Sequence, residues 1–528
     1  MRLTKLIIRN YKSIKHLEID DFQNLNVFIG KNDAGKSNIF RALDILFNSN
    51  IHDYSGSMSI LKEDLMETVY EGSSIYHFFN KKNHEAEITA YLELSDSEIS
   101  RYGLSSDEED KTLVVSKKLL GEKNHTRILV NFMRLNRNVI VKAPDEKKRF
   151  LKRGGSYTDL VDECVGRKFL EELENEFILI PADRNIVRDP HPLSEKVRVE
   201  SYMKDSLINL ANSDDENERL LFNQFIQFIG KISPLIEIID PVVENKRVVD
   251  IKFKTGKNEE IPLSTIGGGN NELLLLLHEI IISGGRILAI EEPEIHLHPE
   301  AERKLFRFMD EFSQTTQIFV VTHSPVFVEP MNLRGLHRVV KKDDETIIYS
   351  MNQNDYVDRN RLEQELNTEN CEMFFADKVL LVEGISDKIL MEGLIDKYCK
   401  STDEIKVISA FSKDNFEVYI DLLRIFKIPY KVMTDLDALK GRYKIKIIWR
   451  ELREHSNLKN RYERISFLKL KHIHVLSQGD LERSYPKRFR RGLTKPLDAL
   501  FALHHLTDED YNSDKMKDLR EVIEALEE

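Results

Sequence analysis

Length, composition and charge set the first limits on this chain. Its 528 residues are too many for one compact core and predict three or four folding units. Hydrophobic residues at 41% and charged residues at 32% indicate folded globular material and argue against a disordered or membrane-embedded chain. We find no export signal at the N-terminus and no metal-ligand spacing among the 3 cysteines, so we expect a cytoplasmic protein without a zinc site or a disulfide framework.

The formal net charge is −12, but the charge is unevenly distributed. Residues 440–495 contain 17 Lys and Arg against 5 Asp and Glu. Affinity for phosphates depends on local charge rather than on the sum. The stretch alone fits a solvated face as well as a DNA-binding surface. Its position beside the carboxylates described below favours DNA.

The first predicted strands cover residues 3–9 and 25–30, and the second leads through the loop GKNDAGKSN into a predicted helix. This loop is a Walker A motif, which implies ATP as the cofactor. Backbone N–H groups and the helix N-terminus would hold the phosphates, Lys36 would reach the β and γ oxygens, and Ser37 would ligate Mg²⁺. The predicted nucleotide-binding residues of the loop are Gly30, Asn32, Gly35, Lys36, Ser37 and Asn38.

The interval after this helix divides into a strand-rich part and a helical part. Residues 86–142 alternate apolar and polar side chains, which predicts an antiparallel sheet flanking the nucleotide-binding core. Residues 177–186 begin with a further core strand. The charged helical pattern that follows predicts an inserted helical module at 187–235.

Three further segments complete the predicted nucleotide site. A glycine-rich turn at 263–272, which includes Gly268, opens an apolar helix and is a potential anion site. The apolar strand that ends in Glu291 and Glu292 is a Walker B pattern, in which Glu291 would hold the Mg²⁺ shell and Glu292 would activate the attacking water. The strand at 317–322 then delivers His323 to its carboxyl end.

A second group of acidic residues follows after residue 370. A buried strand at 378–382 ends in Glu383, and another at 430–434 is followed by Asp435 and Asp437. A strand and a helix between them form a βαβ pattern. Carboxylates at the carboxyl ends of neighbouring parallel strands are suitable ligands for Mg²⁺.

Taken in this order, the Walker A loop, the glycine-rich turn, EEPEIHLHP and THSP resemble the ABC ATPase head of RecF, SMC and OLD proteins. The second acidic group resembles the TOPRIM domain of topoisomerases, primases and OLD nucleases. Over nearly its whole length the chain is therefore similar to the OLD (overcoming lysogenization defect) family of ATP-dependent endonucleases, including the Gabija nuclease subunit. His296 and His298 fall in the loop after Walker B and are not interpreted as metal ligands.

The resemblance implies an α/β fold, in which an ABC-type ATPase head of mixed sheets and helices carries an inserted helical module and is followed by a TOPRIM α/β domain. The domains implied are an ATPase N-terminal part at 1–186, a helical insertion at 187–235, an ATPase C-terminal part at 236–350 and a TOPRIM nuclease domain with a basic C-terminal region at 371–528. The insertion is either the dimerisation module that OLD proteins carry there or an ordinary surface hairpin.

The resemblance also implies the site residues and the partners. The implied metal ligands are Glu383, Asp387, Asp435, Asp437, Asp480 and Glu482, with Ser37 for the nucleotide-bound ion, and the implied catalytic residues are Glu383, Asp435, Asp437, Lys495 and Glu292. The segment 409–413 lacks the glycines often found there in TOPRIM domains, so Lys413 receives no role. The implied cofactors are ATP and Mg²⁺ or Mn²⁺. The implied partners are DNA, a second copy of the chain in a homodimer or larger homo-oligomer, and a defence-system component such as a helicase or a reverse transcriptase product; no membrane is involved.

Two functions follow from these expectations. The first is an ATP-binding, metal-dependent DNA endonuclease acting in anti-phage defence. The alternative is a RecF-like DNA-repair ATPase whose TOPRIM domain does not catalyse. The complete acidic set argues against the alternative, because clustered carboxylates repel one another unless a metal binds them. A topoisomerase would need a nucleophilic tyrosine in a separate domain, which the sequence does not show.

Overall fold

The computed structural model describes residues 1–48, 59–64, 67–71, 79–80, 84–101, 111–121, 125–135, 138–142, 173, 176–182, 195–232, 238–254, 260, 268–440, 445–455, 458, 460–492 and 494–528. The chain divides into two compact units. The first consists of Met1–Phe327 with Gly335–Ile348, and the second of Val328–Arg334 with Tyr349–Glu528. Each unit has its own sheet and its own hydrophobic core.

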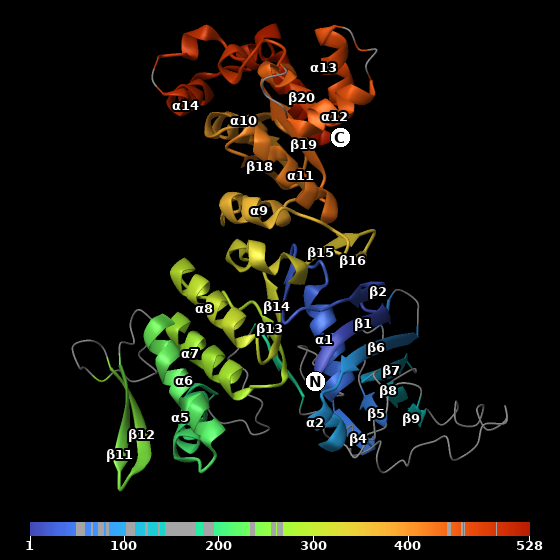
Figure 1. Cartoon of the computed structure of the whole chain (residues 1–528), viewed down its shortest axis with the longest axis vertical. Helices are drawn as coiled ribbons and strands as arrows, with labels where there is room; N and C mark the ends of the chain where they lie inside the picture. Colours follow the sequence, from blue (N-terminus) through green and yellow to red (C-terminus); the bar gives the residue numbers. More distant parts are fainter. Residues whose placement is uncertain are drawn as a thin grey trace, which may run out of the picture. The chain divides into compact units, whose positions relative to one another are not determined.

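The first unit is built on a six-stranded sheet in the order β10-β13-β14-β3-β15-β16 (Figure 1). Neighbouring strands from β10 to β15 run parallel. The strands are β3 (Leu25–Ile29), β10 (Phe177–Ile180), β13 (Ile287–Glu291), β14 (Gln317–Thr322), β15 (Leu336–Lys342) and β16 (Glu345–Ser350). Every residue of β3, β13 and β14 is buried, which explains their continuous apolar sequence. The carboxyl ends of these three strands meet at one edge of the sheet.

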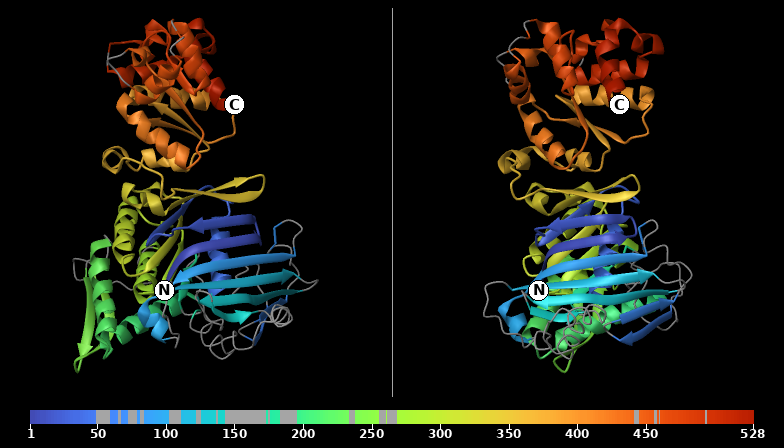
Figure 2. Two further views of the ribbon diagram at one scale, coloured as in Figure 1. Left: turned by 45° about the vertical axis from the view of Figure 1, so that its right-hand side comes forward. Right: turned by 90° about the vertical axis from the view of Figure 1, so that its right-hand side faces the viewer.

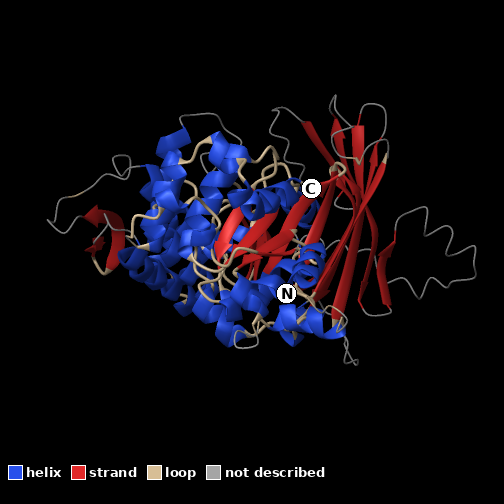
Figure 3. Ribbon diagram, turned by 90° about the horizontal axis from the view of Figure 1, so that it is seen from above, coloured by secondary structure: helices blue, strands red, loops and turns tan. Residues whose placement is uncertain are grey.

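An antiparallel sheet forms the second layer of this unit, in the order β2-β1-β6-β7-β8-β5-β4 with β9 paired to β8. Figure 2 and Figure 3 show its long strands standing together as one layer. The strands are β1 (Arg2–Tyr11), β2 (Ile14–Asp20), β4 (Ser59–Asp64), β5 (Glu67–Glu71), β6 (Glu85–Glu93), β7 (Thr112–Gly121), β8 (His125–Leu135) and β9 (Asn138–Lys142). The antiparallel sheet predicted from residues 86–142 is therefore confirmed.

Helix α1 (Lys36–Asn48) lies in the core that the two sheets share. The Phe40 ring meets the Phe28 ring of β3 edge-on at 5.6 Å, and the Phe47 ring stacks on the Phe177 ring of β10 at 5.1 Å. From the other sheet, the buried Lys117 donates a hydrogen bond to the Ile45 carbonyl at 3.2 Å. The helix that follows the Walker A loop is thus held from both sides. Helix α2 (Asp96–Arg101) follows β6 in the chain.

The predicted helical insertion contains two helices, α5 (Glu195–Asn212) and α6 (Glu216–Ile232). Ser206 of α5 hydrogen-bonds His278 of α7 (Gly268–Ile282) at 2.9 Å, and the rings of Phe228 and Phe308 lie 4.3 Å apart, which joins α6 to α8 (Pro299–Phe312). A hairpin, β11 (Ile238–Glu244) and β12 (Arg247–Lys254), follows and was not predicted. Residues 183–194 and 233–237 at the borders of the insertion lie outside the described residues.

The second unit contains a four-stranded sheet in the order β18-β17-β19-β20, in which all neighbours are parallel. The strands are β17 (Lys378–Val382), β18 (Ile405–Ser409), β19 (Tyr430–Thr434) and β20 (Ile473–Val475). Helices α10 (Ile385–Tyr398), α14 (Lys495–His505) and α16 (Lys517–Glu527) share one core with the sheet. The βαβ pattern predicted around Glu383 and Asp435 is confirmed, with β17 and β19 as direct neighbours.

The other helices of this unit complete its covering. They are α9 (Arg359–Glu365), α11 (Phe416–Ile425), α12 (Lys446–Glu454), α13 (Arg461–Leu470) and α15 (Asp508–Tyr511). Helix α11 follows β18 and buries most of its apolar side chains. Short 3-10 turns cover Pro325–Phe327, Pro330–Gly335, Asn370–Phe374, Lys413–Asn415, Leu436–Leu439, Leu481–Arg483, Lys487–Phe489 and Asp514–Met516. In the described part of the chain, no helix has the length and apolar character needed to cross a membrane.

Candidate active sites

The Walker A loop connects β3 to α1 through backbone conformations that favour glycine. Gly30 has φ +147° and Gly35 has φ +98°, both in the left-handed half of conformational space. A Cβ on Gly30 would lie 2.1 Å from the Val339 carbonyl oxygen of β15. A Cβ on Gly35 would lie 2.1 Å from the Thr346 hydroxyl of β16. The two glycines are therefore required by close packing as well as by the turn.

Lys36 folds back on its own loop. Its ammonium donates hydrogen bonds to the carbonyls of Gly30 and Lys31, each at 2.8 Å, and the residue is only 5% exposed. Burial lowers the pKa of Lys36 to about 8, and the negative charges of Glu292 and Glu294 oppose this effect. A buried cation at the amino end of α1 is arranged to meet an anion such as a phosphate.

Glu291 lies at the carboxyl end of β13, and the Ser37 hydroxyl of the Walker A loop hydrogen-bonds its carboxylate. The pKa of Glu291 is raised, first because the residue is buried and despite this hydrogen bond. The structure thus brings together the two oxygen ligands that the sequence predicted for the nucleotide-bound ion. Hydroxyl and carboxylate oxygens are ligands that Mg²⁺ accepts.

Glu292, Glu294 and His323 gather where β13 and β14 end. His323 Nε2 lies 3.7 Å from Glu292 Oε1, and the His323 backbone N–H donates to Glu294 Oε1 at 2.7 Å. Burial and the nearby charge of Lys36 lower the pKa of His323, which favours a neutral imidazole. Glu294 was missed by the sequence analysis, although the third acid of EEPE was visible there; it positions His323 through the backbone.

The remaining predicted nucleotide-binding residues lie around this edge. Asn32 is exposed in the loop, while the Asn38 side chain donates to the Ser13 hydroxyl at 2.9 Å. Gly268 begins α7, and the preceding residues 261–267 of the glycine-rich turn lie outside the described residues. His296 pairs with Glu272 of α7 at 2.9 Å, and His298 caps α8, so both histidines have structural partners.

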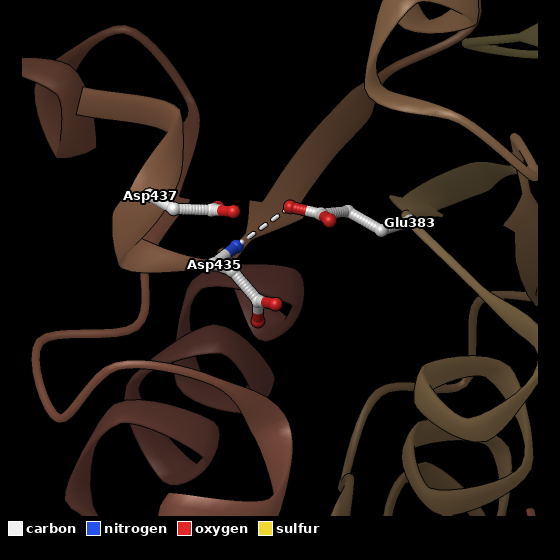
Figure 4. A group of neighbouring side chains, drawn as sticks. All are labelled: Glu383, Asp435 and Asp437. Atoms are coloured by element: carbon white, nitrogen blue, oxygen red, sulfur yellow. Dashed lines mark hydrogen bonds between the residues drawn. The ribbon is translucent and has the colours of Figure 1, made fainter. Parts of the chain in front are cut away.

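In the second unit, Glu383, Asp435 and Asp437 form one acidic cluster (Figure 4). One carboxylate oxygen from each lies within 4.8 Å of the others. Glu383 follows β17, and both aspartates follow β19, its direct neighbour in the sheet. Figure 4 shows the Glu383 and Asp437 carboxylates pointing toward one another from these two strand ends. Parallel pairing therefore creates the cluster that the sequence predicted.

Hydrogen bonds from the β19 end orient Glu383. Its Oε1 accepts from the Thr434 hydroxyl at 2.5 Å and from the Asp435 backbone N–H at 2.7 Å. These two donors fix one oxygen and aim the carboxylate at the cluster. Thr434 was not among the predicted site residues, because a threonine within a buried strand gives no sequence signal of its own.

The electrostatics of the cluster fit a divalent cation. Burial raises the pKa of Asp435 to about 8, and the charges of Glu383 and Asp387 add to the effect. Burial and Glu383 raise the pKa of Asp387 to about 7, although its carboxylate also accepts a hydrogen bond from Gly384 N–H at 3.0 Å. Carboxylates held this close repel one another, and a bound cation removes that cost. The donor set consists of hard oxygens, as Mg²⁺ and Mn²⁺ prefer.

Lys413, to which the sequence analysis gave no role, lies inside this site. Its ammonium is 3.3 Å from Glu383 Oε2 and forms an ion pair with Asp437 Oδ1. Lys413 follows β18, on the opposite side of β17 from the aspartates. The lysine therefore supplies positive charge to the cluster. Its sequence signal was weak because the glycines expected beside it are absent.

Two of the three charged residues predicted later in the chain line the same pocket. A pocket of about 430 Å³ is lined by Glu383, Asp387, Lys413, Asp435, Glu482 and Lys495, among others. Lys495, at the first position of α14, forms an ion pair with Glu482 at 3.0 Å and remains 70% exposed. Asp480 does not line this pocket; it caps the turn Leu481–Arg483 by accepting from Arg483 N–H at 3.0 Å.

Comparison with known families identifies both units. Residues 25–329 match the family described as "AAA domain, putative AbiEii toxin, Type IV TA system". Residues 374–437 match the family described as "Overcoming lysogenization defect protein-like, TOPRIM domain". Together these two domains imply that the chain binds a nucleotide and a divalent metal ion.

Individual relatives match part of the chain or most of it. The OLD nuclease of Thermus scotoductus is 30% identical over 160 residues, which cover 28% of this chain and 30% of that protein. Endonuclease GajA of Bacillus cereus strain VD045 is 25% identical over 426 residues, which cover 75% of this chain and 68% of the relative. The match to the first of these relatives thus spans less than a third of its length.

Solved structures of SMC heads are also similar. The SMC head bound to the C-winged helix domain of ScpA is 14% identical, with a TM-score of 0.43 over 67% of this chain and 99% of that one. The fold is that of an AAA-domain ATPase of mixed sheets and helices followed by a TOPRIM domain. The chain belongs to the AAA-domain family matched over residues 25–329, and it also carries an OLD-like TOPRIM domain.

Proposed function

We propose that this protein is an ATP-dependent DNA endonuclease that hydrolyses phosphodiesters in its TOPRIM domain with Mg²⁺ or Mn²⁺. The observation that carries the proposal is the convergence of Glu383, Asp435 and Asp437 at adjacent strand ends, with one oxygen of each within 4.8 Å of the others. The relatives named OLD nuclease and endonuclease GajA support the same activity.

The roles of the residues follow from their positions. Glu383, Asp435 and Asp437 would hold the metal, with Asp387 and Glu482 at the same pocket available for a second ion. When bound, a divalent metal lowers the pKa of a water nucleophile and stabilises the charge on the leaving oxygen. Thr434 keeps Glu383 aimed at the cluster. Lys495, largely exposed at the pocket, offers its ammonium to a substrate phosphate.

The ATPase unit would bind ATP through the Walker A loop, with Ser37 and Glu291 around the magnesium ion. Glu292 and His323 lie together at the ends of β13 and β14 and would position the attacking water. Heads of this class enclose ATP between two copies, so we further propose a homodimer or larger homo-oligomer, with the α5–α6 insertion as the candidate dimerisation element.

Exposed cations of the second unit provide a surface for DNA. They are Arg461, Arg483, Lys487, Arg488, Arg491 and Lys495. Among these cations, Lys495 lines the acidic pocket. Binding by such residues releases counterions from DNA, so the affinity should fall steeply with rising salt.

The experiment incubates supercoiled plasmid with the purified protein, with Mg²⁺ or Mn²⁺ and with or without ATP. The variants are Glu383→Gln, which keeps the size of the side chain, Lys36→Ala, and Asp396→Asn as a control on an exposed face of α10. Nicking by the wild type and by Asp396→Asn but not by Glu383→Gln is the expected result. Comparison of Lys36→Ala with the wild type then shows whether ATP binding stimulates or inhibits cleavage.

Cleavage by Glu383→Gln at the wild-type rate would overturn the assignment of the site. If the wild type hydrolyses ATP and cuts no DNA under any condition, the repair-ATPase function replaces the nuclease. Relatives named RecF match parts of the chain, with 34% identity over 64 residues for the protein from Lactobacillus acidophilus and 25% identity over 151 residues for the protein from Bacillus mycoides. A defence role, with a helicase or a reverse transcriptase product as partner, is proposed from the resemblance to the Gabija nuclease subunit.

A further inference from the structure

Phe411 occupies an unusual position for a large apolar side chain. It follows β18 and lines the same pocket as Glu383 and Asp435. The residue is 58% exposed, whereas Phe374, Phe416 and Phe426 of the same unit are completely buried. An exposed phenylalanine forgoes the stabilisation that burial would supply. Packing of the fold therefore does not explain why an aromatic ring stands at this place.

The backbone of Phe411 is also strained. Its φ of +55° lies in the left-handed region, which a bulky side chain rarely adopts. The Ser412 N–H donates to the Ala410 carbonyl across Phe411 at 2.6 Å, the pattern of a γ-turn, and with positive φ at its centre this turn is the rare, strained form. Glycine would adopt it without cost. Two unfavourable features thus meet in one residue.

Neighbouring hydrogen bonds hold this conformation in place. Ala410 N–H donates to the Val382 carbonyl at 2.9 Å, directly before Glu383. The Asn415 side chain donates to the Ala410 carbonyl at 3.0 Å. The strained turn is therefore anchored to β17 on one side and to the start of α11 on the other. Strain that the surroundings enforce is typical of functional sites.

Phe411 lines the same pocket as the proposed metal ligands Glu383 and Asp435. Lys413, two residues further along the same turn, contacts the metal-binding carboxylates Glu383 and Asp437. A phosphate bound at these carboxylates would carry a nucleoside on each side, and Phe411 and Ser412 line the same pocket. An exposed aromatic face beside a phosphate site is suited to stacking on a base.

We propose that Phe411 is a stacking platform for an unpaired base next to the scissile phosphate. This inference rests on the proposed nuclease function and specifies its substrate class. Inside a duplex, each base is stacked on both faces and paired, so it cannot reach the ring without being extruded. At a gap, a flap or a frayed end, a base is free to stack. The protein therefore prefers DNA with unpaired nucleotides at the cleavage point.

The test combines a change in the protein with a change in the DNA. Fluorescence anisotropy measures the binding of a labelled gapped oligonucleotide by the full-length protein, with Ca²⁺ in place of Mg²⁺ to prevent cleavage. Wild type and Phe411→Ala are each compared on the intact gap and on gaps in which one nucleotide at a time is abasic. Phe411→Tyr keeps the ring, and Tyr356→Ala removes a different exposed aromatic side chain of the same unit.

The expected result is a coupling between the ring and one base. Phe411→Ala weakens binding to the intact gap about 5- to 150-fold, the range for loss of one base–aromatic stack, while Phe411→Tyr and Tyr356→Ala bind like the wild type. At one abasic position, the affinity of the wild type for the gap falls by the same factor, whereas the affinity of Phe411→Ala does not fall further. The proposal would be overturned if, at every abasic position, the loss of DNA affinity caused by Phe411→Ala simply multiplied with the loss caused by the missing base.

Two controls separate this inference from other failures. Phe411→Gly removes the ring and relieves the strained turn, so it should unfold at or above the wild-type temperature while binding the gap as weakly as Phe411→Ala. Normal gap binding by Phe411→Gly would exclude stacking. DNA binding in Ca²⁺ is measured without cleavage. Absence of nuclease activity would therefore refute the proposed function without bearing on the stacking of Phe411. In cleavage assays with Mg²⁺, a wild type that cuts paired and gapped DNA equally contradicts the inference alone.

Discussion

Replacing Asp435 with asparagine should separate metal binding from folding. In the metal-free protein, burial and Glu383 raise the pKa of Asp435 from 3.8 to about 8. At pH 6 the folded protein therefore keeps a proton that the unfolded chain has released, and this proton favours the folded state. The advantage is lost as the pH rises through 8, where the carboxylate ionises in the folded protein as well. Asparagine has no charge to desolvate, so the variant should lack this loss.

The size of the effect follows from the same pKa. The change from 3.8 to about 8 corresponds to at most about 6 kcal/mol at about 1.4 kcal/mol for each tenfold change in proton affinity. Asp435 is only partly buried, and screening by solvent reduces the figure to about 2 kcal/mol. In a unit of this size, about 2 kcal/mol moves the midpoint of thermal unfolding by about 4–8 °C.

Trp449 makes the measurement specific to the second unit, because it is the only tryptophan of the chain and lies in α12. Its fluorescence is followed during thermal unfolding in EDTA at pH 6 and pH 8.5. The wild type should lose stability between these pH values relative to Asp435→Asn, and at pH 8.5 the variant should unfold about 4–8 °C higher. The exposed Asp396→Asn of α10 should behave like the wild type.

Adding Mn²⁺ at pH 8.5 completes the test. The metal should stabilise the wild type and Asp396→Asn and leave Asp435→Asn nearly unchanged, because the variant lacks one of the clustered oxygens. The reasoning is refuted if Asp435→Asn unfolds below the wild type at pH 8.5 in EDTA. Equal stabilisation of both proteins by Mn²⁺ would instead show that the metal binds elsewhere.

Three further perturbations test other parts of the structure. Lys413→Met removes the cation that pairs with Glu383 and Asp437. Trp449 fluorescence should therefore show that the metal-free second unit is less stable and that Mn²⁺ stabilises it more than it stabilises the wild type. An unchanged effect of Mn²⁺ would argue against a shared cluster. Gly30→Ala forces a Cβ to within 2.1 Å of the Val339 carbonyl oxygen and should destabilise the ATPase unit by about 3 kcal/mol. Helical circular dichroism should then be lost at a lower temperature than in the wild type. Unchanged stability would refute this close contact. Lys36→Ala should weaken the binding of a fluorescent ATP analogue at least tenfold without altering the Trp449 transition, and equal affinity would place the nucleotide elsewhere.

Local sequence patterns were sufficient for the parts whose chemistry is contiguous. The Walker A loop, the Walker B strand and the two acidic strand ends each place their functional groups directly after a buried apolar run. Such a short run, bounded by turn residues, is typical of a central strand, and its carboxyl end in a parallel sheet is where ligand groups collect. The alternating pattern at 86–142 predicted the flanking antiparallel sheet, because alternation of apolar and polar side chains is typical of strands with one buried face.

The positions that sequence reasoning missed act on distant partners. Glu294 supports the His323 backbone, and Thr434 orients Glu383; neither role is visible without knowing which strands are neighbours.

Asp480 was predicted as a metal ligand together with Glu482. Only Glu482 lines the pocket, because the turn Leu481–Arg483 directs Asp480 to its own backbone.

The sequence by itself determined the kinds of groups and the strands that carry them, because hydrophobic periodicity and loop chemistry are local properties. Tertiary structure decided which groups meet. Strand order places β17 between β18 and β19, and this order alone brings Lys413 from one neighbour and Asp435 from the other to Glu383. Strand order depends on packing across the whole unit, and no local pattern encodes it. The same order brings Phe411 to the lining of the acidic pocket, in a conformation that its own sequence would not predict.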